Sequence, residues 1–531
     1  MIRLSDLSFP LDYTENDLHA AVSRLLRINP AEIRRVTLVR RAVDARRRDH
    51  VHFTLTVDVE TAREESAVLT HAACKKAAAV KRFSYVPPAQ SVPFTHRPVV
   101  VGAGPAGLFA ARILSAAGAR PLLLERGRDV DSRSADIARF LATGRLDPAS
   151  NVQFGEGGAG TFSDGKLNTG IKDMRIRFVL EEFVRCGAPE EILWQAKPHI
   201  GTDRLRQTVK GLRRQIERDG GEIRFGCRVR QLLTQNGQLT ALLVDGPKGE
   251  EEIPASRVIL AIGHSARDTV AALYAQGIRM EQKPFAVGVR IEHPRVWIDR
   301  AQYGTAAGHP ALGAADYKLV THLPSGRGVY TFCMCPGGTV IAAASEEGGL
   351  VVNGMSEFAR DAVNSNSALL VGVSPADFPD AHPLSGITLQ RQMERAAFTL
   401  GGGQYRAPVQ LVGDFLRGRA SSGAGEVLPS YRPGVTWCDL TDCLPPFVSA
   451  SLREAIPQFG HRLRRFDDRD AVLTGVESRS SSPVRILRDE NGEASLSGVY
   501  PCGEGAGYAG GITSAAVDGI RCAEWVLAHP R

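Results

Sequence analysis

Hydrophobic residues change their spacing several times along the chain, and each change marks a different predicted element. Residues 99–101 are continuously apolar, which favours a buried strand, and residues 105–117 carry the apolar residues of a buried helix. A second short apolar run at 122–124 predicts another buried strand. The pattern therefore indicates a β-α-β unit of a parallel sheet.

Three glycines occupy the turn between the first of these strands and the helix. Gly102 permits the tight turn, Gly104 lets a pyrophosphate approach the backbone, and Gly107 lets the helix pack on the strand. Glu125 ends the second strand, 18 residues beyond Gly107, where an acid can hydrogen-bond an adenosine ribose. Free N–H groups at the helix start would hold the phosphates. We therefore predict a dinucleotide site; the alternative is a purely structural glycine turn.

Residues 1–85 have the pattern of a small separate α/β module. Thr14 can cap a helix whose apolar residues recur at helical spacing, and strands are expected at 36–43 and 51–59. A further helix is expected at 64–80. This order of elements suits a ferredoxin-like fold.

Positive charge is concentrated near the start of the chain. The net charge is +7, and residues 1–97 hold 16 Lys and Arg against 11 Asp and Glu, an excess of +5. Arg46, Arg47 and Arg48 lie between the two expected strands. They are either a solvated hairpin turn or a binding site for the phosphates of RNA or for another acidic partner. Without an aromatic RNA-reading motif, the solvated turn is favoured.

The remaining composition narrows the class of protein. The chain has 531 residues, enough for two to four domains, and 43% hydrophobic and 23% charged residues, as in globular proteins. We expect no membrane span and no signal peptide, because long apolar runs are missing. Nine cysteines without a pattern fit a reduced, cytoplasmic setting, and no metal site is assigned.

A second glycine-rich stretch covers residues 155–170. Glycines such as Gly157 and Gly158 allow a close backbone approach, while Thr161, Ser163 and Lys166 supply donors and acceptors. The stretch is expected to wrap a cofactor rather than to be a mobile surface loop. Helices are expected at 171–218, followed by short strands at 222–229, 238–245 and 251–253 and by a buried strand, 257–263, that ends at Gly263.

The last forty residues return to the cofactor. A strand ends at Gly503 and Glu504, and a helix of small residues begins near Gly511. A carboxylate at that strand end can hold ribityl hydroxyls, and a helix N-terminus can face the flavin pyrimidine. Two cofactor-facing helix starts indicate FAD rather than NAD.

The pattern changes between residues 283 and 488, where strand-like pieces mix with long loops. We expect an inserted α+β substrate or cap domain there. Within it, Cys333 and Cys335 form a Cys-x-Cys on a strand, which points both thiols to one face. Inert buried cysteines are the favoured interpretation, and a redox role is the alternative.

Several long motifs together resemble the glutathione-reductase-like FAD-binding superfamily and, more closely, the bacterial FAD-dependent dehydrogenase family. They lie at 102–107, 155–167, 263–269, 283–290, 332–338 and 502–512. The resemblance implies a Rossmann-like FAD-binding domain with an inserted domain and an oxidoreductase activity, without an established substrate. A second GxGxxG unit and a Cys-x-x-Cys are missing, so NAD(P)H is expected only as a transient donor.

The sequence thus yields one set of expectations for sites and domains. The residues expected to bind FAD are Gly102, Gly104, Pro105, Ala106, Gly107, Glu125, Arg126, Gly157, Gly158, Thr161, Ser163, Val229, Gly263, Gly503, Glu504, Gly511, Ile512 and Ser514. The catalytic candidates are Lys166, His264 and Cys335, with Arg267 and Arg290 as further guesses on the substrate side. The expected division is a module at 1–85, a linker at 86–98, an FAD-binding domain at 97–282 plus 489–531, and the inserted domain at 283–488.

Three functions remain open at this point. The leading hypothesis is an FAD-dependent oxidoreductase whose small-molecule substrate binds between the cap domain and the flavin. A flavoenzyme that modifies RNA through the basic module is the second. The third is a non-enzymatic flavin-loaded redox sensor or partner-binding scaffold, because a fold alone does not fix a function.

Overall fold

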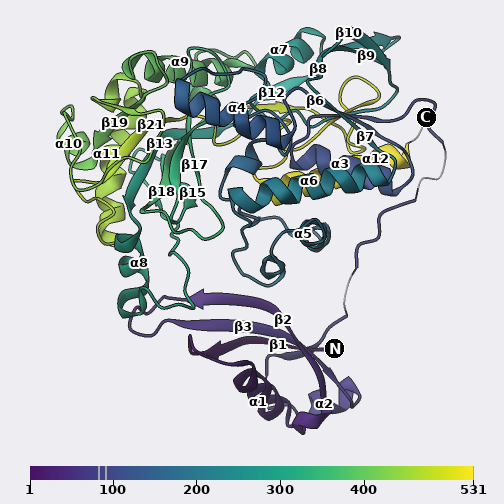
Figure 1. Cartoon of the computed structure of the whole chain (residues 1–531), viewed down its shortest axis with the longest axis vertical. Helices are drawn as coiled ribbons and strands as arrows, with labels where there is room; N and C mark the ends of the chain where they lie inside the picture. Colours follow the sequence, from purple (N-terminus) through teal and green to yellow (C-terminus); the bar gives the residue numbers. More distant parts are fainter. Residues whose placement is uncertain (74, 82–83, 90–92, 530–531) are drawn as a thin grey trace.

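The computed structural model describes residues 1–531 except 74, 82–83, 90–92 and 530–531. A five-stranded parallel sheet lies on the right side of the upper part of the molecule, where β6 and β7 are labelled (Figure 1). Its strands, in spatial order, are β23 (Val499–Pro501), β11 (Val258–Leu260), β5 (Val99–Val101), β6 (Leu122–Glu125) and β7 (Glu222–Phe225). The predicted β-α-β unit is therefore present.

Both faces of this sheet are covered, which explains why its strands are almost wholly apolar. Val100, Leu123 and Ile259 share one core with the helices α3 (Pro105–Ala116), α5 (Arg175–Arg185), α6 (Thr202–Arg218) and α12 (Ile512–Ala528). The alternate residues face the meander β8 (Arg228–Gln235), β9 (Gln238–Gly246) and β10 (Gly249–Pro254), and α7 (Arg267–Ala275). The strand expected at 222–229 is in fact two strands, β7 and β8, because the chain changes sheets between them.

The two ends of the Rossmann-like part pack directly on each other. A Cβ at Gly519 in α12 would lie 2.0 Å from the Ala106 carbonyl oxygen in α3. Only glycine therefore permits this helix contact, which packs the middle of α12 against the first turn of α3.

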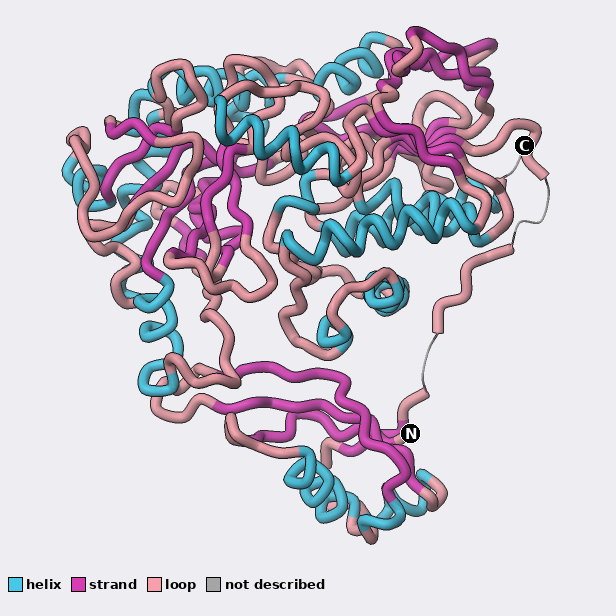
Figure 2. Tube along the Cα trace, in the orientation of Figure 1, coloured by secondary structure: helices cyan, strands magenta, loops and turns pink. Residues whose placement is uncertain are grey.

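A seven-stranded sheet organises residues 285–477 (Figure 2). Its strands, in spatial order, are β14 (Val320–His322), β15 (Gly328–Cys335), β18 (Asn364–Val373), β13 (Phe285–Pro294), β21 (Val472–Glu477), β19 (Ala407–Leu411) and β20 (Val435–Trp437). The surrounding helices are α8 (Arg295–Tyr303), α9 (Ser385–Leu400), α10 (Val412–Arg417) and α11 (Pro446–Arg462). Two short pairs complete this part: β16 (Thr339–Ala342) with β17 (Val352–Met355), and β12 (Met280–Gln282) with β22 (Val484–Ile486).

The N-terminal module, purple in Figure 1, has its own sheet and core. Its elements are β1 (Ile2–Phe9), α1 (Glu15–Leu26), β2 (Ile33–Asp44), β3 (His52–Thr61), α2 (Glu65–His71) and β4 (Ala77–Ala79). The antiparallel strand order is β2-β3-β1-β4, and Thr14 caps α1 as predicted. The helix expected at 64–80 is wrong beyond His71, because residues 77–79 pair with the edge of β1 instead. This tertiary contact outweighs the helix propensity of alanine.

The module contacts the rest of the chain through β2. Arg41 exchanges backbone hydrogen bonds with Trp194 and Ala196, and its guanidinium lies 4.5 Å from the Trp194 ring centroid. The described residues of 86–98 form neither helix nor strand, while 90–92 lie outside the described residues. No helix in the described part of the chain is both long and apolar enough to cross a membrane.

Candidate functional site

A cavity of about 980 Å³ lies where the parallel sheet, the glycine-rich stretch and the seven-stranded sheet meet. The glycine turn before α3 lines one wall, and the start of α12 lines another. Residues of β15 and β21 line a third side. Segments from the two ends of the Rossmann-like part therefore border one space, as the sequence predicted.

The first glycine turn is shaped by close backbone contacts. Gly102 has a φ of +102°, and a Cβ there would lie 2.3 Å from the Ala261 carbonyl oxygen. A Cβ at Gly107 would lie 1.8 Å from the Gly102 carbonyl oxygen. At Gly104, by contrast, the nearest atom is the Gly158 Cα at 3.9 Å, so the backbone faces open space. A phosphate group fits this arrangement of bare backbone at a helix N-terminus.

Glu125 connects the first turn to the glycine-rich stretch. One carboxylate oxygen accepts the Ala103 N–H at 2.7 Å, and the other accepts those of Gly127 and Gly155, both at 2.9 Å. The side chain is buried and borders the cavity. The carboxylate thus holds the backbone of the two glycine-containing segments in place. A hydrogen bond from a ribose to this carboxylate stays a prediction, and the carboxylate has lone pairs left to accept it.

The C-terminal turn supplies a second set of groups. Glu504 Oε1 lies 3.4 Å from His264 Nδ1, so two predicted site residues are brought together in the cavity wall. Asp518 accepts the Gly503 N–H at 2.7 Å and also pairs with Arg488, which holds the turn in place. A Cβ at Gly511 would meet nothing within 4 Å, so the start of α12 is open to the cavity.

The glycine-rich stretch carries a buried ion cluster. Asp164 accepts from Lys166 at 2.6 Å and from Arg360 Nε at 2.9 Å, and it also binds the Ser356 hydroxyl. These cations hold the pKa of Asp164 well below its usual range despite its burial. Burial lowers the pKa of Lys166, but the attraction of Asp164 together with that of Cys335 and Cys333 outweighs it, and the pKa is raised. Lys166 is also one of the residues that line the cavity.

Most of the predicted FAD-binding residues and catalytic candidates line the cavity, and five do not. Those that line it are Gly102, Gly104, Pro105, Ala106, Glu125, Arg126, Gly158, Ser163, Lys166, Val229, Gly263, His264, Glu504, Gly511, Ile512 and Ser514. The five that stay outside the lining are Gly107, Gly157, Thr161, Gly503 and Cys335. Thr161 and Cys335 are buried, and the three glycines act through backbone geometry. The sequence analysis missed some residues that line the cavity, because they belong to no local motif. These residues include Gln153, Arg228, Asn353 and Glu477.

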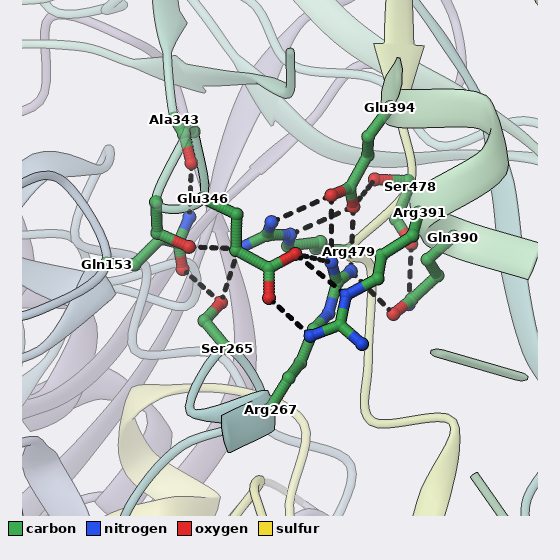
Figure 3. Close-up of polar contacts among 11 residues, drawn as sticks. Gln153, Ser265, Arg267, Ala343, Glu346, Gln390, Arg391, Glu394, Ser478 and Arg479 are labelled. Carbon is green, nitrogen blue, oxygen red and sulfur yellow. Dashed lines mark hydrogen bonds and ion pairs between the residues drawn. The ribbon is translucent and has the colours of Figure 1, made fainter. Parts of the chain in front are cut away.

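A buried charge network joins the two larger parts behind the cavity (Figure 3). Glu394 on α9 accepts from Arg267 at 2.7 and 2.8 Å and from Arg479 at 2.8 and 3.0 Å. Gln153, Ser265 and Gln390 extend the network at its edges. Arg267, a guess for the substrate side, is thus committed to structure and lies outside the lining. The two guanidinium groups hold the pKa of Glu394 well below its usual range.

Arg290 is likewise held within the protein. Its guanidinium pairs with Glu477 and donates to the Asn353 side-chain oxygen at 2.7 Å and to the Cys333 carbonyl at 2.9 Å. It is fully buried and does not line the cavity, although Asn353, Glu477 and Cys333 do. Its role is therefore to position these three groups.

Two other clusters carry less chemistry. Cys502, Asp518 and Cys522 are close enough to surround a metal ion, but Asp518 already pairs with Arg488 and the Gly503 N–H. The positive charge of the Arg488 guanidinium would repel a metal ion bound beside Asp518. In the N-terminal hairpin, Arg46 pairs with Asp44 and Arg47 with Asp49. These pairs favour the solvated-turn interpretation of the basic hairpin.

Comparison with known proteins identifies the family. The description "NAD(P)-binding Rossmann-like domain" matches residues 100–149, "FAD-dependent protein, C-terminal domain-like" matches 284–480, and a domain of unknown function matches 1–60. An uncharacterized protein of Clostridium beijerinckii is 46% identical over 533 residues, covering 99% of this chain and 98% of that protein. This chain belongs to a family of FAD-dependent oxidoreductases. The resemblance found in the sequence is confirmed at this level.

Solved structures that this flavoprotein resembles are distant. A triple mutant of the flavin-dependent brominase Bmp2 aligns with a TM-score of 0.39 at 13% identity, covering 82% of this chain and 81% of that one. A geranylgeranyl bacteriochlorophyll reductase-like protein from Thermoplasma acidophilum aligns with a TM-score of 0.35 at 13% identity, covering 81% and 77%. Similarity at this level has no bearing on the reaction.

Proposed function

We propose that this FAD-dependent protein oxidises or reduces a small molecule bound in the cavity between the flavin and the β15 wall. The observation that carries the proposal is the shared cavity, bordered by the N-termini of α3 and α12 on one side and by β15 on the other. A cofactor and a second ligand both fit a space of about 980 Å³. The cofactor domain is proposed to be of the glutathione-reductase-like type.

The bound flavin would supply the electron chemistry, and the chain's residues would position it. Gly104 and Gly158 would admit the pyrophosphate between two bare backbone segments. Glu504 would accept from hydroxyls of the ribityl chain, and His264 beside it would hold that carboxylate in place. The open start of α12 would place its free N–H groups and positive dipole end against the ring.

The substrate side would be formed by the glycine-rich stretch and β15. Lys166 is the cation there whose ammonium borders the cavity while Asp164 holds it in place. It would donate a hydrogen bond to a polar substrate atom. The proposed domains are 1–85, the linker 86–98, 97–282 with 489–531, and 283–488.

The purified protein tests this proposal directly. It should be yellow and release FAD on acid precipitation. Its flavin should bleach anaerobically with NADH, NADPH or a member of a panel of hydroxy acids and amines. A colourless protein that does not bind added FAD would exclude the proposal. If none of these donors reduces the bound flavin, the dehydrogenase reaction is excluded. Neither the site nor the family comparison supports action on RNA or a non-enzymatic role.

A further inference from the structure

Cys333 is displaced from the regular path of β15 into the cavity. Phe332 pairs with Ala368 of β18, but the next pair is Cys335 with Asn366, so the register shifts between them. Cys333 has a φ of +41°, which is unusual for a residue other than glycine. It is half-buried, and it lines the cavity. A bulge of this kind redirects a side chain at a functional site.

The charges around Cys333 favour its thiolate form. Arg290 donates to the Cys333 carbonyl at 2.9 Å, and Lys166 donates to the carbonyl of Met334, the next residue. Asp164 and Glu477 also face this region, but they are paired with Lys166 and Arg290 respectively. The Cys335 thiol and the two cations lower the pKa of Cys333 well below that of an ordinary thiol.

Cys335 is held directly behind Cys333. Its thiol is fully buried and donates to the Cys333 carbonyl at 3.4 Å. A Cβ at Gly354 would lie 2.9 Å from the Cys335 sulfur, so the neighbouring strand leaves no room for it to move away. Burial and the neighbouring thiolate raise the pKa of Cys335, so one thiol of the pair keeps its proton.

We propose that Cys333 and Cys335 are a redox-active dithiol that exchanges an electron pair with the bound flavin. The exchange rests on the proposed function, whereas the reactivity of Cys333 does not. In the oxidising direction, the two sulfur atoms form a bond, and Cys335 loses its proton. The electron pair and that proton would go to bound oxidised FAD, which would supply the two-electron acceptor, so that charge and atoms balance. The reverse step breaks the disulfide and oxidises the flavin.

The reactivity of the thiol is tested by alkylation of the unaltered holoenzyme. Cys186 and Cys438 are half-buried like Cys333, but burial raises the pKa of both. With iodoacetamide near pH 6.5, where an ordinary thiol is protonated, we expect Cys333 to react at least about tenfold faster than either. Peptide mapping measures the three rates. Equal rates would overturn the proposal.

The pairing is tested by oxidation and by reductive titration. Diamide should join Cys333 to Cys335 in the wild type and in a Cys438→Ser control, but not in Cys335→Ser. In an anaerobic dithionite titration, the wild type oxidised in this way should consume about twice as many electrons per flavin as Cys335→Ser. Equal consumption, or no disulfide, would overturn the dithiol. If the purified protein binds no flavin, both the proposed function and the electron exchange are excluded. The alkylation rates still test the reactivity of Cys333 in that case.

Discussion

Arg267 at the start of α7 donates two hydrogen bonds, at 2.7 and 2.8 Å, to Glu394 on α9. Arg267 follows β11 of the parallel sheet in the chain, and Glu394 precedes β19 of the seven-stranded sheet, so this ion pair couples the two parts of the protein (Figure 3). Both side chains are almost completely buried, and Arg479 uses the other lone pairs of the same carboxylate. Removal of Glu394 therefore leaves Arg479 buried without its carboxylate partner, while Arg267 keeps only Glu346, which accepts from it at 2.9 Å.

We expect Glu394→Ala to lower the free energy of unfolding by about 3–5 kcal/mol, the usual cost of an uncompensated buried charge. The control is Arg391→Ala on the same helix, because Arg391 pairs with Glu346 near the surface. That pair should contribute no more than about 1 kcal/mol. Urea unfolding measures both variants. Equal losses would show that burial of the network has no energetic effect.

Asp164 and Lys166 should respond unequally to substitution. Asp164→Asn removes the carboxylate that Lys166 and Arg360 share, and it should cost about 3 kcal/mol or more. In Lys166→Met, Arg360 and Ser356 still satisfy Asp164, so the cost should stay near 1 kcal/mol. Thermal unfolding of the flavin-free proteins measures the difference. A larger loss in Lys166→Met would contradict this assignment.

Substitutions of two glycines in the first turn should affect different properties, one the affinity for FAD and the other the stability of the fold. A Cβ at Gly104 would meet only the Gly158 Cα at 3.9 Å, so Gly104→Ala should fold normally. It should weaken FAD binding at least about tenfold, because the methyl group enters the space proposed for the pyrophosphate. Gly107→Ala should instead destabilise the protein itself by about 3 kcal/mol, because its methyl group meets the Gly102 carbonyl.

The matched control for these variants is Gly313→Ala, at an exposed glycine where a Cβ meets nothing within 4 Å. Flavin fluorescence measures affinity, and thermal unfolding of the flavin-free protein measures stability. Unchanged FAD affinity in Gly104→Ala would place the pyrophosphate elsewhere.

The buried His293 should make the protein less stable in acid. Burial lowers its pKa to about 4, whereas an unfolded histidine titrates near 6.5. The unfolded state therefore binds a proton first, and the stability contributed by neutral His293 is lost as pH falls from about 6.5 to about 4. His293→Gln can still donate to the Phe466 carbonyl that His293 Nε2 contacts at 2.8 Å.

We expect His293→Gln to reduce the slope of melting temperature against pH in that window. The slope should not vanish, because the pKa of His199 is also lowered to about 4. His19→Gln, at an exposed position on α1, serves as the control and should leave the slope unchanged. If the melting temperature of His293→Gln depends on pH as steeply as that of the wild type, the assignment of this pH dependence to His293 is contradicted.

Local patterns along the chain sufficed to predict several of the segments that line the cavity. The turn at Gly102–Gly107, the acid Glu125 and the start of α12 obey local rules, since tight turns and helix starts are set by neighbouring residues. The order of elements also predicted a change of pattern after residue 283, and the seven-stranded sheet begins with β13 at Phe285.

Only the tertiary structure decided what each charged or reactive side chain does. Arg267 and Arg290 are committed to Glu394 and Glu477, which lie more than a hundred residues away. The bulge in β15, rather than the Cys-x-Cys spacing, places Cys333 in the cavity and leaves Cys335 behind it. The physical reason is that conformation at a turn depends on neighbouring residues, whereas burial and ion pairing depend on groups that only folding brings together.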